Sequence, residues 1–141
     1  MVQLNPYLTF DGNCRQAMEF YQKALGGELF IQTVGESPMA KETPKEFHGQ
    51  IMHAKLESKG MVLMASDNMM HDKFMPGNNV ALSLNCDSDE EIKRLFAALS
   101  QRGKVEMMLA DQFWGATYGM LTDLFGVRWM LNFQKTPSGG M

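Results

Sequence analysis

Apolar residues recur every three or four positions in two stretches of the chain, residues 14–25 and 90–101. This spacing places them on one side of a helix, so both stretches are predicted to be helices with one buried face. The buried positions would be Ala17, Phe20, Tyr21 and Ala24 in the first helix, and Ile92, Leu95, Phe96 and Leu99 in the second. Asn13 and the run Asp87-Ser88-Asp89 are suitable N-caps, and Gly26-Gly27 is expected to end the first helix.

Segments with alternating apolar and β-branched residues surround these helices and predict strands. One strand precedes each helix and three follow it, the last two as a hairpin. The predicted strands are residues 4–10, 28–34, 49–57 and 61–65 in the first half, and 80–86, 104–108, 115–122 and 127–133 in the second. Residues 35–48 contain two prolines and mixed charges and are expected to form a loop.

The order of strand, helix and three strands therefore occurs twice, and a repeat of this kind sets the architecture. We predict an α+β protein with two βαβββ modules, residues 1–66 and 79–135, a connecting loop at 67–78 and a frayed tail at 136–141. One helix covers one face of each sheet, so the other faces are expected to form a curved mixed sheet with a concave cleft for a small molecule. The alternative is an ordinary α+β domain in which this order occurs twice by chance.

The composition narrows the function classes. The chain has 141 residues, a net charge of −3 and a pI of about 5.6, so it lacks the basic surplus of a nucleic-acid-binding protein. No apolar run reaches the roughly 18 residues of a membrane span, and the first residues lack the segments of a signal peptide. A cytoplasmic location is expected. The 14 methionines either fill the core or line an adaptable pocket.

Two runs in the second half are distinctive, Phe113-Trp114-Gly115 and Phe125-Gly126-Val127-Arg128-Trp129. Weaker matches are residues 5–14, 20–21, 26–29, 52–54, 63–67, 111–119 and 122–132. Together they resemble the PhnB-like branch of the vicinal oxygen chelate superfamily, which includes glyoxalase I, extradiol dioxygenases and bleomycin resistance proteins. The resemblance implies paired βαβββ modules and a homodimer. Many such proteins carry the label 3-demethylubiquinone 3-methyltransferase, but the chain has no Gly-rich strand-to-helix turn for a nucleotide-type cofactor, so methyl transfer is not expected.

The resemblance also implies four positions at which enzymes of this superfamily hold a divalent metal. In this chain they match Asn5, Met64, Asn79 and Met130. Divalent Zn, Ni, Mn and Fe prefer imidazole and carboxylate ligands to amides and thioethers, so no metal and no other cofactor is expected there. A displaced ligand set of His53, Asp67 and His71 is the alternative.

Six residues are candidates for binding a small molecule: Tyr7, His53, Asp67, Trp114, Tyr118 and Arg128. His53 is predicted to face the cleft or solvent, either as a general base or hydrogen-bonding group, or as a structural histidine. Trp114, Tyr118 and Arg128 would form an aromatic wall and an anion anchor, unless Trp114 packs at the module seam or in a dimer interface.

Three further residues have simpler expected roles. Asp123 is expected to stabilise the last hairpin turn by accepting backbone amides. Cys14 and Cys86 lie at predicted helix starts, where thiolate character can rise, but no base is paired with either, so nucleophilic catalysis is not expected.

Three functions remain open. The first is metal-independent binding of a small molecule in the sheet cleft, with whether any reaction is catalysed left open. The second is a metal-dependent enzyme of glyoxalase or dioxygenase type with displaced ligands. The third is a dimeric interaction module whose cleft is filled by its own side chains.

Overall fold

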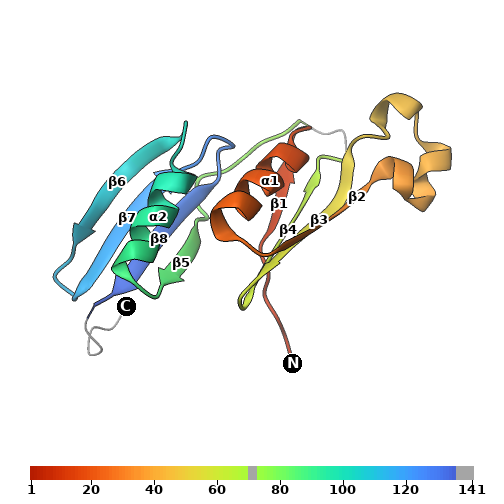
Figure 1. Ribbon diagram of the computed structural model, residues 1–141. Coiled ribbons are helices and arrows are strands. Elements are labelled where there is room, and N and C mark those ends of the chain that lie inside the picture. Colours follow the sequence, from red (N-terminus) through yellow and green to blue (C-terminus); the bar gives the residue numbers. More distant parts are fainter. Residues whose placement is uncertain (70–72, 136–141) are drawn as a thin grey trace. The chain divides into compact units, whose positions relative to one another are not determined.

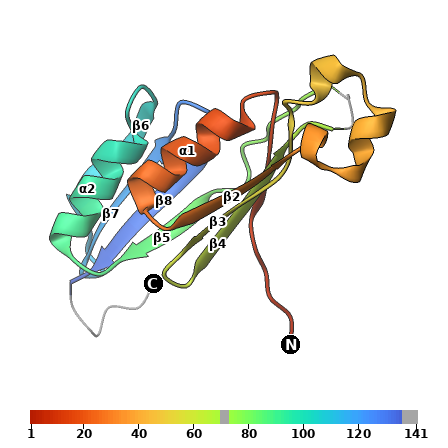
Figure 2. The ribbon, with the colours of Figure 1, turned by 45° about the vertical axis from the view of Figure 1, so that its right-hand side comes forward.

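The computed structural model describes residues 1–69 and 73–135 and divides the chain into two compact units, Met1–Met75 and Pro76–Met141. Among the described residues, each unit contains one α-helix and a four-stranded mixed sheet (Figures 1 and 2). This confirms the predicted α+β class with two βαβββ modules. His71 and the predicted tail at 136–141 lie outside the described residues.

In the first unit the last strand lies inside the sheet. The strand order is β1-β4-β3-β2, and β1 is parallel to β4 while the other pairs are antiparallel. The elements are β1 (Tyr7–Phe10), α1 (Cys14–Leu25), β2 (Glu28–Thr33), β3 (Ile51–Ser58) and β4 (Met61–Asp67). Three short 3-10 helices precede β3: η1 (Val34–Glu36), η2 (Pro38–Glu42) and η3 (Lys45–Phe47).

Helix α1 covers one face of this sheet because its apolar residues are spaced to lie on one side. Ala17, Met18, Tyr21 and Ala24 are buried, and so are the sheet residues Ala54, Leu56, Leu63 and Ala65. Met18 is fully buried where the spacing predicted Phe20, which remains partly exposed. The opposite face of the sheet carries the odd-numbered residues His53 and Lys55 of β3, as the strand periodicity requires.

The second unit repeats this arrangement with the strand order β5-β8-β7-β6. Its elements are β5 (Leu82–Cys86), α2 (Asp89–Leu99), β6 (Lys104–Asp111), β7 (Ala116–Thr122) and β8 (Arg128–Gln134). Ser88 caps α2 by accepting the Glu91 amide, while Glu91 accepts the Asp87 amide. Gly119 of β7 leaves room for the ring of Phe96, which an added Cβ would approach to 2.8 Å.

The structure differs from four local expectations. Strand β1 begins at Tyr7 rather than at Leu4, after Pro6, which has no amide hydrogen to donate to the sheet. Residues 35–48, expected to form a loop, consist largely of three 3-10 turns, and His48 Nε2 lies 3.0 Å and 2.9 Å from the carbonyl oxygens of Ala40 and Thr43. Asn13 makes no side-chain cap. Strand β6 is longer than expected, with two register shifts.

Candidate functional site

The face of the first sheet opposite α1 holds an aromatic pair, Tyr7 and His53. The Tyr7 hydroxyl lies 3.1 Å from His53 Nδ1, and the two rings stack with centroids 5.7 Å apart. Lys55 lies on the same face, forms an ion pair with Glu57 at 2.8 Å and has its ammonium 5.5 Å from the centre of the Phe30 ring. The structure thus brings two predicted site residues together on an accessible sheet face.

Asp67 lies on the other face of this sheet, against α1. Its carboxylate accepts the Cys14 amide at 3.0 Å and the Ile51 amide at 2.8 Å, and the residue is 3% exposed. Asp67 therefore replaces the expected Asn13 cap from a strand 53 residues away. Asp67 and His53 point to opposite faces of the sheet, so these two members of the displaced metal set do not converge.

The face of the second sheet opposite α2 carries a polar and aromatic cluster, which we call the aryl cluster: Trp114, Tyr118 and Asn132. Tyr118 of β7 and Asn132 of β8 are directly paired across the strands, and the Trp114 ring meets the Tyr118 ring edge-on with centroids 6.0 Å apart. Tyr118 is 9% and Asn132 is 5% exposed. Burial raises the pKa of the Tyr118 phenol, so at neutral pH it keeps its proton.

Two polar atoms of the aryl cluster are buried without a hydrogen-bond partner among the described residues. They are Trp114 Nε1, a donor, and Asn132 Oδ1, an acceptor. The amide nitrogen of Asn132 donates to Asn85 Oδ1 at 3.4 Å, which orients the free oxygen. Buried polar atoms are nearly always paired, so an unpaired donor and an unpaired acceptor in one cluster are unusual and call for an explanation.

Further along the strands, the same sheet face carries first methionines and then charged residues. The next row across β8, β7 and β6 is Met130, Met120 and Met107, and the row beyond it is Arg128, Thr122 and Lys104. At that end Gly77, Asn78, Glu106, Thr122, Gly126 and Arg128 line an open hollow of about 330 Å³. Arg128 Nη1 donates to the Asn78 carbonyl, so the guanidinium is held at the edge of the hollow.

The turn before β8 is stabilised by Asp123, as the sequence predicts. One carboxylate oxygen accepts the amides of Phe125 and Val127 at 2.8 Å and 3.0 Å, and the other accepts Trp129 Nε1 at 2.8 Å. Asp123 is 3% exposed, so this network is internal. Trp129 is therefore a paired indole, in contrast to Trp114.

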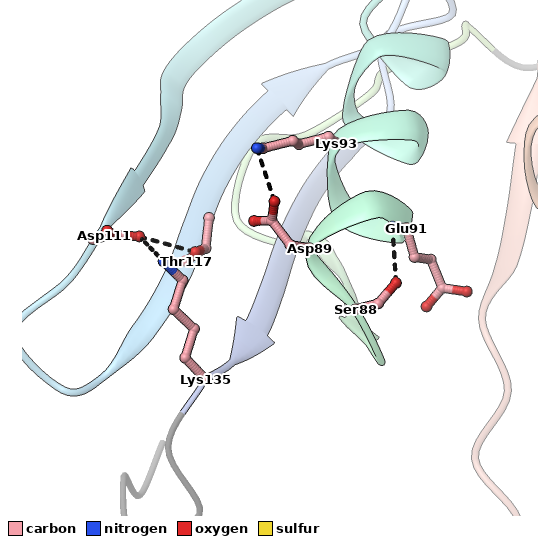
Figure 3. Close-up of polar contacts among 7 residues, drawn as sticks. All are labelled: Ser88, Asp89, Glu91, Lys93, Asp111, Thr117 and Lys135. Atoms are coloured by element: carbon pink, nitrogen blue, oxygen red, sulfur yellow. Dashed lines mark hydrogen bonds and ion pairs between the residues drawn. The ribbon is translucent and has the colours of Figure 1, made fainter.

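A charged network lies at the far end of β6 (Figure 3). Lys135, which follows β8, and Thr117 of β7 both donate to Asp111, at 2.6 Å and 3.0 Å. These hydrogen bonds, with that of Lys135 the larger cause, lower the pKa of the Asp111 carboxyl. Lys93 and Asp89 pair on α2 at 2.8 Å. Each charge in this network has a partner, so it ties strands together rather than offering free charge to a ligand.

Comparison with known proteins identifies the family. A model of the family described as 3-demethylubiquinone-9 3-methyltransferase matches residues 2–132. The chain belongs to this family. Protein YjdN from Escherichia coli K12 is 37% identical over 141 residues, 94% of this chain and 95% of YjdN. The crystal structure of protein PA1353 from Pseudomonas aeruginosa is 42% identical, with a TM-score of 0.87 over 96% of this chain and 100% of that one.

Two further structures connect this family with a wider fold class. A putative 3-demethylubiquinone-9 3-methyltransferase, PhnB protein, from Bacillus cereus is 26% identical, with a TM-score of 0.75 over 94% of this chain and 99% of that one. A glyoxalase/bleomycin resistance protein/dioxygenase from Nocardioides is 18% identical, with a TM-score of 0.62 over 100% and 89% of the two chains. The chain is thus a PhnB-like family member with the glyoxalase/bleomycin resistance fold.

The superfamily's metal positions do not fit divalent Zn, Ni, Mn or Fe in this PhnB-like chain. Met64 lies beside Tyr7 in the first sheet, and Met130 lies beside Met120 in the second, each on the face opposite the helix of its unit. Thioethers are soft ligands, whereas these ions prefer imidazole and carboxylate. Within residues 1–69 and 73–135, the structure contains no cluster of three or more His, Cys, Asp or Glu side chains that could hold a metal.

The cysteines of this family member are buried rather than activated. Burial, followed by the charge of Asp67, raises the pKa of the Cys14 thiol to about 12. Burial also raises the pKa of Cys86 to about 11, with the charges of Glu91 and Asp87 as smaller causes. Thiolate character therefore does not rise at these two helix starts, because desolvation outweighs the effect of the helix N-terminus.

Sequence reasoning missed Asn132, the acceptor of the aryl cluster. Its signal is a polar residue between Leu131 and Phe133 in a strand that the hairpin pattern places inside the sheet. Of the six predicted residues, the structure groups Tyr7 with His53 and Trp114 with Tyr118. Arg128 lies on the same sheet face as Tyr118, and Asp67 is a structural residue.

No helix among the described residues is long and apolar enough to span a bilayer.

Proposed function

We propose that this PhnB-like protein binds a small molecule, without a metal, at the aryl cluster of the second unit. The observation that carries the proposal is the pair of unpartnered buried atoms, Trp114 Nε1 and Asn132 Oδ1. Each such group destabilises the folded protein by about 1–3 kcal/mol when unpaired. A molecule that accepts from the indole and donates to the amide oxygen relieves both, and its binding gains this energy.

The aromatic rings supply the rest of the recognition. Trp114 and Tyr118 meet edge-on, and Phe113 meets Trp114 edge-on with centroids 5.0 Å apart. Phe113 itself is 96% exposed, so a large apolar ring is available beside the cluster. Apolar walls with a few oriented polar groups are typical of small-molecule sites. We therefore propose a planar, heteroatom-bearing ring as the bound group.

The binding proposal needs no acid–base residue and no metal. The thioether and amide groups at the superfamily's metal positions support the metal-independent form. Tyr7 and His53 form a second polar aromatic surface in the first unit, and their mutual hydrogen bond occupies His53 Nδ1. We propose no reaction for this pair.

The two tryptophans provide a direct test. In a ¹⁵N–¹H spectrum the chain gives two indole signals, assigned by recording the Trp114→Phe variant. A library of aromatic heterocycles is then added at millimolar concentration. We expect fragments that bind to move the Trp114 signal downfield as Nε1 gains an acceptor. The Trp129 signal serves as the internal control, because its Nε1 is already bonded to Asp123. A library in which no fragment moves the Trp114 signal refutes the proposal.

A further inference from the structure

On the face of the second sheet opposite α2, the side chains change from aromatic and polar at one end, through methionines, to charged at the other. The aryl cluster lies at one end, and Arg128 lies at the other, four residues from Asn132 along β8. At about 3.3 Å per residue these two ends are about 13 Å apart. Met130 and Met120 lie between them as a directly paired row.

Arg128 is the cation that lines the hollow at that end, where the Glu106 carboxylate also lies. The neighbouring cation Lys104 is 77% exposed and lies 3.9 Å from Glu106, which also accepts the Thr122 hydroxyl at 3.2 Å. The only partner that the structure gives Arg128 among the described residues is the neutral carbonyl of Asn78. The guanidinium has five donors in a planar fork, so several remain to bind a carboxylate or phosphate in the hollow.

The methionine row joins the two ends with an apolar and adaptable surface. Met130 and Met120 are partly exposed, and Met107 at the edge of the sheet is 46% exposed. Methionine side chains are flexible and polarizable, so they fit linear or irregular apolar groups. An alkyl or aryl spacer lying along β8 therefore contacts the row between the polar ends.

We infer that the bound molecule is an elongated organic anion, with a ring at the aryl cluster, an apolar middle on the methionine row and an acidic group at Arg128. This inference rests on the proposed function and specifies its ligand class. It assigns Arg128 the role of recognising the acid about 13 Å from the ring. It also predicts that a ring alone binds more weakly than a ring with an acidic tail of matching length.

Dansyl probes separate the two proposals because their fluorescence reports binding of the ring. Dansylamide carries the ring, sulfonyl acceptors and an amide donor, while 8-(dansylamino)octanoate adds an acid on a spacer that spans the methionine row. Dansylglycine has the acid but too short a spacer, and the octanoate methyl ester has the spacer without the charge. We expect the octanoate to bind wild-type protein about tenfold more tightly than its methyl ester, the effect of one charge-assisted interaction. The ester should bind more tightly than dansylamide because its spacer contacts the methionine row, and dansylglycine should bind more weakly than the octanoate.

The matched variants are Arg128→Gln and Lys104→Gln, which remove one positive charge each from the same row. Arg128→Gln should abolish the tenfold gain and leave dansylamide affinity unchanged, while Lys104→Gln should keep most of the gain. Higher salt should reduce the gain, because the hollow is open to solvent. Equal affinity of all four probes, or a gain that survives in Arg128→Gln, overturns the inference while the ring site stands. Failure of every probe to bind, together with a silent Trp114 signal, overturns the proposed function itself.

Discussion

Removing the carboxylate of Asp67 should destabilise the first unit rather than affect ligand binding. Asp67 joins two elements that are distant in sequence, since it accepts the first amide of α1 from Cys14 and the first amide of β3 from Ile51. The residue is 3% exposed, so water does not replace either bond in a variant. Asp67→Asn keeps one acceptor oxygen, and Asp67→Ala keeps none.

The magnitude follows from the number of bonds lost. A hydrogen bond to a charged group contributes about 1.5–3 kcal/mol, and a buried amide left unpaired costs a similar amount. Asp67→Asn should therefore lower the free energy of unfolding by about 2 kcal/mol, and Asp67→Ala by about 4 kcal/mol. A domain of this size has about 5–15 kcal/mol in total, so about 1–11 kcal/mol should remain in the alanine variant.

Urea denaturation followed by far-UV circular dichroism measures this directly. With a slope of about 1–3 kcal/mol per molar urea, the asparagine variant should move its midpoint down by roughly 1 M. Asp11→Asn is the matched control, because Asp11 is an exposed carboxylate in the turn before α1 and should change stability by less than about 0.5 kcal/mol. A wild-type midpoint for Asp67→Asn would refute the capping role and return Asp67 to the list of ligand residues.

Three other predictions concern backbone geometry, capping and pH. Gly27 has φ +98° and an added Cβ would lie 2.1 Å from a carbonyl oxygen of β3, so Gly27→Ala should prevent folding of the first unit. Gly26 has φ +76° and open space around it, so Gly26→Ala should lower the free energy of unfolding by only about 1 kcal/mol. Circular dichroism distinguishes the two variants. Ser88→Ala should lower the thermal midpoint through loss of about 1 kcal/mol of capping energy, and Ser88→Asp should restore it. Burial raises the pKa of the Cys14 thiol to about 12 from 9.0, so between these pH values the folded state keeps a proton that the unfolded chain loses. The stabilisation from this thiol is complete below about pH 9 and is lost as the pH rises toward 12. Cys14→Ala should therefore flatten this part of the plot of urea midpoint against pH.

The elements that sequence predicts well are those set by local periodicity. Helix α1 has the predicted bounds, and α2 begins and ends within two residues of them, because apolar spacing, caps and glycines all act within a few residues. The structure of residues 35–48 is harder to predict from sequence, because their helical turns depend on contacts such as that of His48 with the Ala40 carbonyl. Prolines and charges alone did not reveal those contacts.

The candidate site was predicted only in part, because it too depends on contacts between residues that are distant in the sequence. The aromatic residues Trp114 and Tyr118 stand out in sequence, and the structure does bring them together. Asn132 joins them only through the cross-strand register of β7 and β8. The capping role of Asp67 was not predicted, because a carboxylate near a strand end gives no local sign that it will cap a helix 53 residues earlier in the chain.

In the sheet of the first unit, β4 lies between β1 and β3, and this order has a consequence for synthesis on the ribosome. Among the described residues, strand β1 pairs with β4 alone, so Tyr7 cannot enter this sheet before Met64 has been made. Until then β1 has no strand to pair with, and an unpaired strand in an incomplete unit can bind chaperones or neighbouring nascent chains. A stop codon placed before residue 61 should therefore yield a fragment that is captured or degraded, and one placed before residue 128 should do the same to the second unit by leaving β5 without a neighbour.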